Sequence, residues 1–335
     1  MIKVKKLINS NFCDVIGNTP LIKLKKASEI SGCNILGKCE FLNPGGSVKD
    51  RAANQIINDA VKNGKISEGG IIVEGTAGNT GIGLTLVANS MNIKTIIVMP
   101  ETQSKEKKKM LKLCGADLRL VKAVPYKNPA NYVKFSEKIA KELKNKQGVF
   151  WANQFDNTSN LMAHYNSTGP EIWRDTQQTV DAFICSVGTG GTLTGVAKFL
   201  REKKKDIIIG LADPFGSALF NYYKNGQLKS EGNSITEGIG QGRITRNLEN
   251  LLVDFQFRIS DENALNVVFD ILKNEGIILG GSSGINIAGA IKLGQKIGPG
   301  KTIVTILCDY GTRYESKIFN KDFLKKNNLP IPDWL

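Results

Sequence analysis

Hydrophobic positions follow two alternating patterns along the chain. Short apolar, β-branched runs are typical of buried strands, and apolar residues at i, i+3 and i+4 are typical of amphipathic helices. Such helices are predicted over residues 52–61, before Gly64, and over residues 84–91. The predicted strands are Gly70–Glu74, Thr95–Met99, Leu118–Val121, Val149–Ala152, Asp181–Val187, Ile207–Ala212 and Thr302–Cys308.

This alternation predicts the fold class. Fully apolar strands that alternate with helices indicate an α/β fold with parallel sheets covered on both faces. Two successive series, roughly Gly70–Gln154 and Asp181–Asp309, predict two α/β lobes. A ligand is expected between the lobes, beyond the carboxyl ends of the strands.

The first candidate site is the loop Asn43–Arg51, of sequence NPGGSVKDR. One proline and two glycines predict an irregular turn, which places Lys49 near the N-terminus of the following helix. The positive end of the helix dipole disfavours an ammonium there, and a Schiff-base lysine needs the neutral amine. An exposed lysine in a first helical turn explains the same spacing, so the spacing alone leaves both interpretations open.

Two glycine-rich loops follow predicted strands. Residues 74–81, EGTAGNTG, offer backbone N–H groups, hydroxyls and an amide to a carboxylate or phosphate, although an ordinary capped βα loop reads the same. Residues 188–192, GTGGT, precede a helix predicted to reach about Lys203 and resemble a phosphate cradle. Leu193 replaces the third glycine of G-x-G-x-x-G, and no P-loop lysine follows, which disfavours dinucleotides and ATP. Residues 280–284, GGSSG, are explained alone by a serine cap with glycine turns.

Composition narrows the class of protein. The chain has 335 residues, 41% of them hydrophobic and 23% charged, as in ordinary globular proteins with room for two domains. No apolar run could span a membrane, and Met1–Leu7 lacks the pattern of a signal peptide, so we expect a cytoplasmic protein. Six scattered cysteines and one histidine predict neither a disulfide framework nor a zinc site. Cys185 and Cys308 lie in strand-like runs and are expected to be buried thiols.

The net charge of +14 has to be explained. The lysine runs 107–109 and 203–205 lie on predicted helix faces, and no aromatic residues interleave with them as nucleic-acid binding would require. We therefore expect solvated helix surfaces rather than a nucleic-acid site. Part of the charge is expected to attract an anionic cofactor and anionic substrates.

Taken together and in this order, the four loops resemble those of the cysteine synthase and cystathionine β-synthase family, the fold type II pyridoxal-5′-phosphate (PLP) enzymes. The resemblance runs from residues 16–20, IGNTP, through 168–173, TGPEIW, and 237–240, EGIG, to Asp309. It implies a tryptophan synthase β-like fold of two three-layer α/β lobes with mostly parallel twisted sheets and the active site between them. Residues 45–157 would form the smaller lobe, and residues 12–44 and 158–335 the larger one.

The resemblance also implies a role for each loop. Lys49 would hold PLP covalently and act as the general base. A serine hydroxyl at the pyridine nitrogen would leave that nitrogen uncharged and favour β-elimination over transamination. The implied cofactor-binding residues are Lys49, Asn79 at the ring 3′-oxygen, Ser282 at the ring nitrogen, and Gly188, Thr189, Gly190, Gly191 and Thr192 at the phosphate. The implied substrate-binding residues are Thr76, Ala77, Gly78, Asn79, Thr80, Gln154, Gly240 and Arg243, and no metal is implied.

Two positions depart from the common family pattern. Ala77 stands where the carboxylate loop usually has a serine, so one hydroxyl donor is lost. Arg243 stands where sulfhydrylases commonly have an apolar residue. An arginine there suits a second anion, such as the phosphate of O-phosphoserine or thiosulfate. A surface arginine that points away is the alternative.

The expected reaction is replacement of the β-substituent of an activated serine, first of all O-acetylserine plus sulfide to L-cysteine and acetate. The alternatives are O-phosphoserine or thiosulfate as a substrate, the latter giving S-sulfocysteine, or cystathionine formation from serine and homocysteine. We see no further module after Asp309, which disfavours the regulated form of the cystathionine-forming enzyme. Serine or threonine dehydration is a weaker match, and Lys49 argues against a catalytically silent binding protein.

The resemblance further implies a homodimer and a mobile segment around Pro100–Pro129 that closes on the substrate. Some relatives bind serine acetyltransferase, and the sequence leaves that partner open here. Small-molecule substrates, without nucleic acid or membrane, are the expected partners.

Overall fold

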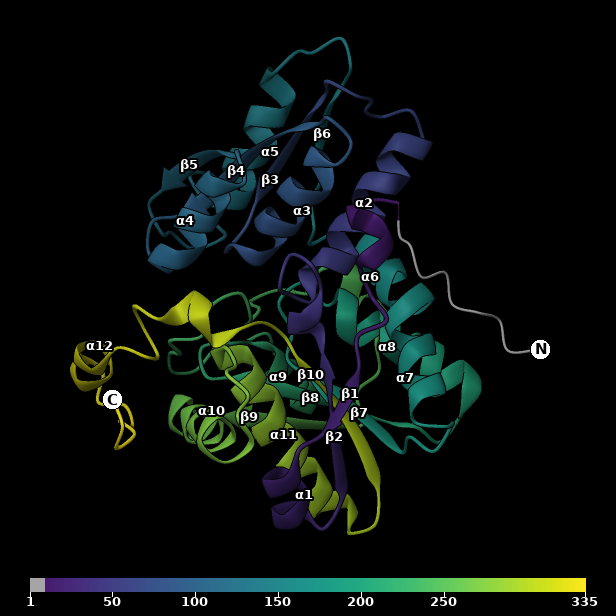
Figure 1. Cartoon of the computed structure of the whole chain (residues 1–335), viewed down its shortest axis with the longest axis vertical. Coiled ribbons are helices and arrows are strands. Elements are labelled where there is room, and N and C mark those ends of the chain that lie inside the picture. The colour runs from purple at the N-terminus through teal and green to yellow at the C-terminus, as the bar shows by residue number, and fades with distance from the viewer. Residues whose placement is uncertain (1–9) are drawn as a thin grey trace.

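The computed structural model describes residues 10–335, so the expectation about Met1–Leu7 lies outside the described residues. The described strands form two sheets, one in each of two lobes (Figure 1). The larger sheet contains β1 (Leu21–Lys23), β2 (Asn34–Cys39), β7 (Ala182–Cys185), β8 (Ile208–Pro214), β9 (Phe255–Ile259) and β10 (Thr302–Leu307). The smaller sheet contains β3 (Ile71–Gly75), β4 (Lys94–Pro100), β5 (Asp117–Val121) and β6 (Val149–Trp151).

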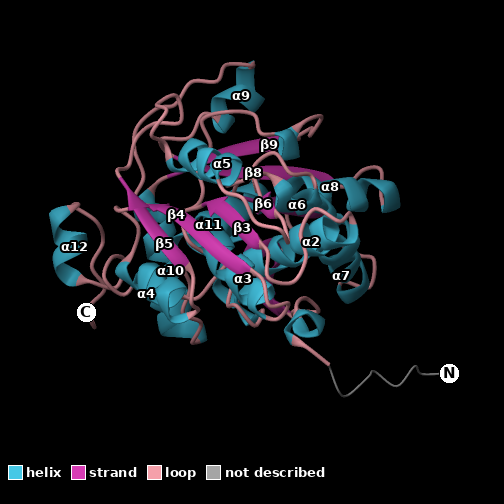
Figure 2. Cartoon of the chain, turned by 90° about the horizontal axis from the view of Figure 1, so that it is seen from above, coloured by secondary structure: helices cyan, strands magenta, loops and turns pink. Residues whose placement is uncertain are grey.

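Helices surround these sheets, as the view from above shows (Figure 2). In the larger lobe, α1, α10 and α11 pack on one face and α7 and α8 on the other. In the smaller lobe, α2 and α3 pack opposite α5. The helices are α1 (Lys25–Ser31), α2 (Lys49–Lys62), α3 (Asn79–Asn89), α4 (Lys105–Leu113), α5 (Tyr132–Glu142), α6 (Ser159–Ala163), α7 (Gly169–Asp175), α8 (Gly191–Lys203), α9 (Leu219–Asn225), α10 (Asp261–Glu275), α11 (Gly281–Ile297) and α12 (Lys321–Lys326).

The sheet topology confirms the predicted α/β class. The larger sheet has the order β1-β2-β10-β7-β8-β9 and the smaller one β5-β4-β3-β6. All of these neighbours pair in parallel except β1 and β2. Parallel strands in the middle of such sheets are covered on both faces, which is why their sequences are continuously apolar. The lobe boundaries at residues 44/45 and 157/158 stay a prediction.

Three strands escaped the sequence analysis because they are not continuously apolar. β1 and β9 lie at the two edges of the larger sheet, where one side of a strand faces solvent. β2 contains Lys38, which is buried and pairs with Glu171 at 2.8 Å and with Asp175 at 3.4 Å. A strand with an internal lysine does not resemble a core strand in sequence. Its burial is compensated by these two carboxylates and by the carbonyl oxygen of Thr19, which accepts from Lys38 Nζ.

Helix α11 packs close to the larger sheet, because small residues face the strands. A Cβ on Gly289 would lie 2.5 Å from the Cβ of Ala212 in β8, so only glycine fits there. This close packing sets the position of the α11 N-terminus and of Ser282 in its first turn. Across residues 10–335, no helix combines the length and the hydropathy that a membrane crossing requires.

A buried arginine joins the two lobes beneath the start of α2. Arg51 is 3% exposed, and its Nε and Nη2 donate to Glu40 at 2.7 and 2.8 Å. Its Nη1 and Nη2 donate to Glu171 in α7, also at 2.7 and 2.8 Å, and Nη2 donates to Thr19. Burial alone would raise the pKa of Glu171, but its contacts with Arg51 and Lys38 lower it to about 2. The guanidinium therefore lies between the carboxyl groups of Glu40 and Glu171 and is hydrogen-bonded to both.

Replacing Arg51 tests how much its buried ion pairs contribute to the free energy of unfolding. Arg51→Lys keeps the charge but removes the planar fork, so buried carboxylate oxygens lose their donors. We expect the free energy of unfolding of the cofactor-loaded protein to fall by about 3 kcal/mol. Urea unfolding measures the change, and Arg174→Lys in the exposed Arg174–Asp175 pair is the control, expected to change it by less than about 0.5 kcal/mol. Equal effects of the two variants would contradict the assignment.

Candidate active site

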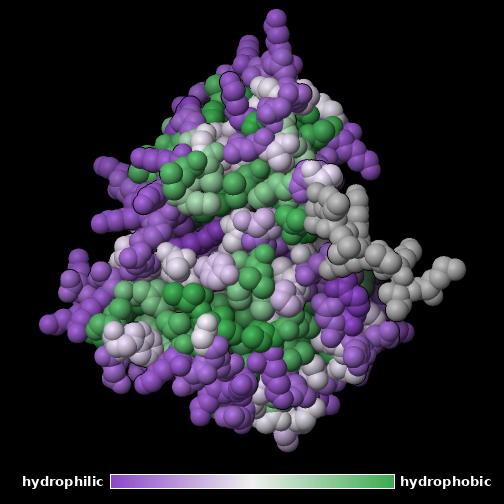
Figure 3. All heavy atoms as spheres, viewed as in Figure 1, coloured by the Kyte–Doolittle hydropathy of each residue, from purple (hydrophilic) through white to green (hydrophobic). Residues whose placement is uncertain are grey.

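A cavity of about 350 Å³ lies at the junction of the lobes, where the sequence analysis expects a ligand. Its walls come from segments that follow β3, β6, β7 and β10, so it lies at the carboxyl ends of strands from both sheets. On the face shown in Figure 3, hydrophilic side chains crowd the outer parts of both lobes, and hydrophobic atoms show mainly toward the middle. The size suits a small-molecule ligand.

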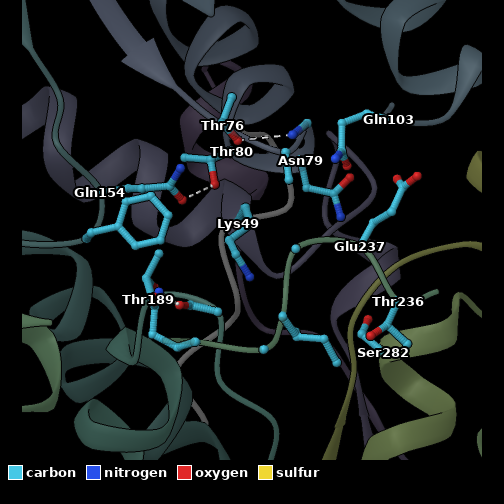
Figure 4. A pocket seen from close by; sticks show the side chains of 18 of the residues that line it. Lys49, Thr76, Asn79, Thr80, Gln103, Gln154, Thr189, Thr236, Glu237 and Ser282 are labelled. Carbon is cyan, nitrogen blue, oxygen red and sulfur yellow. Dashed lines mark hydrogen bonds between the residues drawn. The ribbon is translucent and has the colours of Figure 1, made fainter. Parts of the chain in front are cut away.

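Lys49 extends into the middle of this cavity (Figure 4). It is the first residue of α2, and the loop before it is held to the larger sheet, where Val48 N donates to the carbonyl oxygen of Cys308 at 2.9 Å. The Asp50 carboxylate closes the same loop by accepting from Gly45 N at 2.7 Å. Lys49 is half-buried and faces the cavity instead of bulk solvent, so the geometry favours the functional interpretation of its spacing.

The glycine loop 188–192 packs so closely against its neighbours that side chains would not fit. A Cβ on Gly188 would lie 2.2 Å from the carbonyl oxygen of Gly238, and one on Gly191 would lie 2.1 Å from Asn160 Oδ1. Gly190 has a φ of +93° and is the N-cap of α8, without a side-chain cap. The Gly191 N–H donates to the Thr189 hydroxyl at 3.4 Å, and the next N–H groups of the first turn of α8 have no side-chain cap and remain available to an anion in the recess beside Lys49.

His164 braces this loop, a role that the sequence analysis missed. Its Nε2 lies 3.1 Å from the hydroxyl of Thr192, and its Nδ1 lies 2.9 Å from the hydroxyl of Thr168. Burial and the nearby charges of Arg51 and Lys49 hold the pKa of His164 well below its usual range, so the ring is neutral. The i, i+4 spacing of His164 and Thr168 on a helix was the available signal.

The second glycine-rich loop lies on the opposite wall of the cavity. Gly78 has a φ of +136° at the N-cap of α3, and its N–H donates to the Thr76 hydroxyl at 3.0 Å. The Thr80 hydroxyl donates to Gln154 Oε1 at 2.6 Å, and Gln154 Nε2 donates to the carbonyl oxygen of Gly75 at 3.2 Å (Figure 4). These contacts hold the loop in shape, and the start of α3 has no side-chain cap, so its first N–H groups remain available to an anion.

Lys107 contradicts the expectation of a solvated lysine run. It lies in α4 of the smaller lobe, is 2% exposed, and donates to Glu237 at 2.8 Å and to the Tyr314 hydroxyl at 3.0 Å. Burial lowers the pKa of Lys107, while Glu237 opposes that shift. The expectation was wrong because α4 faces the larger lobe at this point, where a carboxylate and an aromatic ring receive the ammonium.

Comparisons with known proteins agree with this geometry. Residues 13–309 match the family described as pyridoxal-phosphate dependent enzyme. The chain belongs to that family. It is 48% identical to Cysteine synthase 1 of Neurospora crassa over 327 residues, which cover 96% of this chain and 86% of the relative. It is 36% identical to a cystathionine beta-synthase of Dictyostelium discoideum over 332 residues, which cover 98% of this chain and 66% of that protein.

A solved structure is similar to the whole fold. The crystal structure of an O-acetylserine dependent cystathionine beta-synthase from Helicobacter pylori superposes with a TM-score of 0.83 at 35% identity. The match covers 93% of this chain and 98% of that chain. The fold is thus that of the fold type II PLP enzymes, as the sequence indicated.

The residues around the cavity fit PLP. The glycine cradle offers uncapped N–H groups for a phosphate, and Lys49 reaches the same space. Ser282, in the first turn of α11, lines the cavity with them. All predicted site residues line the cavity or its recess except Gly191, which is buried against Asn160.

The Asn79 amide makes contacts across the junction of the lobes, and its predicted role at the cofactor stays a prediction. Its Nδ2 donates to Asp309 Oδ2 at 2.6 Å, and its Oδ1 accepts from Arg313, which also donates to the carbonyl oxygen of Gly45. Asp309 Oδ2 in turn accepts from the Tyr314 hydroxyl at 2.7 Å. The amide thus links the smaller lobe to the larger one, and its second Nδ2 hydrogen remains free for another acceptor.

The structure corrects one expectation about Cys308 and one about Arg243. Cys308 was expected within a buried strand, but it follows β10, is half-buried and lines the cavity. Burial raises the pKa of its thiol to about 11, so it stays protonated. Arg243 does not point away into solvent, since it lines the cavity and pairs with Asp156 at 2.8 Å. The alternative of an outward-pointing arginine was therefore wrong.

A buried carboxyl at the end of β3 predicts an unusual pH dependence of stability. Glu74 is buried, its Oε2 has no hydrogen-bond partner, and burial raises its pKa from 4.5 to about 8. A raised folded-state pKa gives stability that is complete below pH 4.5 and is lost as the pH rises toward about 8. Glu74→Gln should therefore become more stable relative to the parent as the pH rises through that window.

Urea unfolding of both proteins near pH 5 and near pH 8 measures this difference. The exposed Glu101 provides the control, because Glu101→Gln should shift the free energy of unfolding equally at both pH values. A Glu74→Gln advantage that is identical at the two pH values would refute the raised pKa.

Proposed function

We propose that this PLP-dependent enzyme makes L-cysteine from O-acetylserine and sulfide. One observation carries the proposal: Lys49 lies in a single cavity between a phosphate cradle and a carboxylate-binding loop. That arrangement suits a phosphorylated cofactor and an amino-acid substrate at the same time. The cysteine synthases of Neurospora crassa and Dictyostelium discoideum, at 48% and 41% identity over nearly the whole chain, support this reaction class.

The larger lobe would hold the cofactor together with Lys49 of the smaller lobe. The N–H groups at the start of α8 would bind the phosphate, the Ser282 hydroxyl would face the ring nitrogen, and Lys49 would hold the cofactor covalently. When bound, PLP supplies an electron sink for the charge that develops at the substrate α-carbon. The neutral His164 keeps Thr192 oriented toward the phosphate without adding a charge.

The smaller lobe would hold the substrate. The uncapped N-terminus of α3 and the loop Thr76–Thr80 would receive the α-carboxylate, and Gln154 supports that loop from below. Ala77 removes one hydroxyl donor from this loop, but its backbone N–H remains. Helix dipole and backbone donors together make this the expected place for a carboxylate.

Lys49 would move the protons of the reaction. Once its Nζ is free, it removes the proton from the substrate α-carbon. Acetate leaves the β-carbon with the electron pair of its C–O bond, and sulfide forms the new bond at that carbon. Lys49 then returns a proton to the α-carbon. In the described part of the cavity wall, Lys49 is the charged residue without an ion pair, which leaves its amine available.

Cystathionine formation is the second candidate, favoured by the structural neighbour. That Helicobacter pylori protein is described as an O-acetylserine dependent cystathionine beta-synthase, so the same donor meets a larger thiol there. The two reactions share every residue role above and differ only in the nucleophile. The higher identity to cysteine synthases supports sulfide for this chain.

Steady-state rates decide between these reactions. We expect kcat/KM with O-acetylserine to be at least about tenfold higher for sulfide than for homocysteine, and serine to be a poor donor. Cysteine and cystathionine are quantified by chromatography. Faster cystathionine formation would replace the first proposal with the second, and no β-replacement by the cofactor-loaded protein would reject both.

Lys49→Ala tests the catalytic assignment. Loss of the proton-transferring amine and of the covalent link should reduce kcat by about a thousandfold or more and abolish the visible absorbance of the lysine-bound cofactor. Lys62→Ala, at the exposed end of the same helix, is the matched control and should behave as the parent. Turnover of Lys49→Ala comparable to the parent would remove Lys49 from the mechanism.

The family resemblance also supports a cytoplasmic homodimer, which we propose as the working form. Light scattering of the purified protein would show a mass of twice 36.5 kDa. A serine acetyltransferase stays an open partner, which co-purification would reveal.

A further inference from the structure

Arg243 is paired with a carboxylate at the wall of the cavity. Its Nη1 and Nη2 donate to the two oxygens of Asp156, at 3.0 and 2.8 Å, in a forked geometry. The side chains are 23% and 30% exposed, so water screens the pair only in part. Such a pair carries no net charge, and its two charges compensate each other where a substrate would meet the arginine.

Asp156 is held in this place from a second side. Its Oδ1 also accepts from the backbone N–H of Arg246, at 3.0 Å. Burial would raise the pKa of Asp156, but the contacts with Arg243 and Arg246 lower it, so the group is ionised. Phe155 and Arg243 line the cavity, and Asp156 contacts Arg243 from outside that lining.

Two aromatic rings also contact the guanidinium. The Arg243 Cζ lies 4.7 Å from the ring centre of Tyr126 and 5.8 Å from that of Phe155. Tyr126 belongs to the segment Pro100–Pro129 of the smaller lobe, so this cation–π contact crosses the junction of the lobes. The cavity wall at Arg243 is therefore an apolar surface around a neutralised charge.

The other charges at the cavity are compensated in the same way. Among the charged residues described in its lining, Lys107 pairs with Glu237, and Glu237 also pairs with Lys317. Besides Lys49, no cation among the described lining residues lacks a carboxylate partner, so none is left to receive a second anion.

We propose that Asp156 is a specificity-determining residue that acts by neutralising Arg243. It disfavours serine derivatives whose β-substituent is a dianion, such as phosphate, and favours those whose β-substituent is an uncharged ester. A phosphate near Arg243 would also meet the Asp156 carboxylate, whose repulsion offsets the attraction. An uncharged ester meets two aromatic rings and a pair without net charge. The inference rests on the proposed function and assigns its substrate class to a single residue.

Asp156→Asn removes the negative charge and keeps the size of the side chain. We expect the ratio of kcat/KM for O-phosphoserine to that for O-acetylserine, each with sulfide, to rise about tenfold or more. Added salt should reduce this gain, because it screens the uncovered guanidinium. Asp181→Asn is the matched control, since Asp181 is similarly exposed, pairs with Lys204 and accepts from Thr302 N–H, but lies away from the cavity.

Two further variants test whether Asp156 acts through Arg243. In Arg243→Gln the carboxylate is uncovered, so the phosphoserine ratio should fall below that of the parent. In the double variant Asp156→Asn/Arg243→Gln the gain should be lost. Arg243→Gln also keeps the inference testable if Asp156→Asn does not fold, which thermal unfolding and cofactor absorbance would show.

The outcomes separate this inference from the proposed function. Parental turnover of O-acetylserine with a ratio that Asp156→Asn does not raise refutes only the role of Asp156. A gain that persists in the double variant, or a parent that prefers O-phosphoserine, refutes it as well. If the cofactor-loaded parent converts neither donor, the proposed function fails and the inference fails with it.

Discussion

The active site depends on the buried guanidinium of Arg51. This side chain lies two residues after Lys49 and binds Glu40 and Glu171, so the first turn of α2 is held by carboxylates from the larger lobe. Buried charges are tolerated only when each has its partner, and breaking one such contact leaves the others uncompensated. The position of Lys49 is thus secured by an ion cluster that does not line the cavity. Gly17 completes it, since a Cβ there would lie 2.9 Å from Arg51 Nη1.

The same principle organises the cavity. Where the lobes meet, Lys107 with Glu237 and Arg243 with Asp156 bring opposite charges together, and Asn79 bonds to Asp309 across the junction. Each partner offsets part of the cost of removing the charged group from water. Lys49 is left as the amine that can react. The paired charges at the cavity walls serve binding, and the unpaired Lys49 amine at the centre serves the chemistry.

Much of the fold was readable from the sequence, because its signals are local. Seven strands were located, with ends displaced by one or two residues, since continuous apolar runs occur where both faces are buried. The loops at Lys49, Gly78 and Gly190 were readable because positive φ values and helix starts require particular residues. The edge strands β1 and β9 and the lysine-containing β2 were missed, because their half-polar patterns do not distinguish them from loops.

The sequence by itself determined the fold class, the order of the loops and, through the ordered set of motifs, the PLP-dependent chemistry. Only the tertiary structure decided what the charged residues do. Lys107 reads as a surface lysine and is buried, and Arg243 reads as an anion-binding residue and is neutralised by Asp156. The reason is physical. The effect of a charged side chain depends on the other charges within a few ångströms of it, and these come from segments far away along the chain.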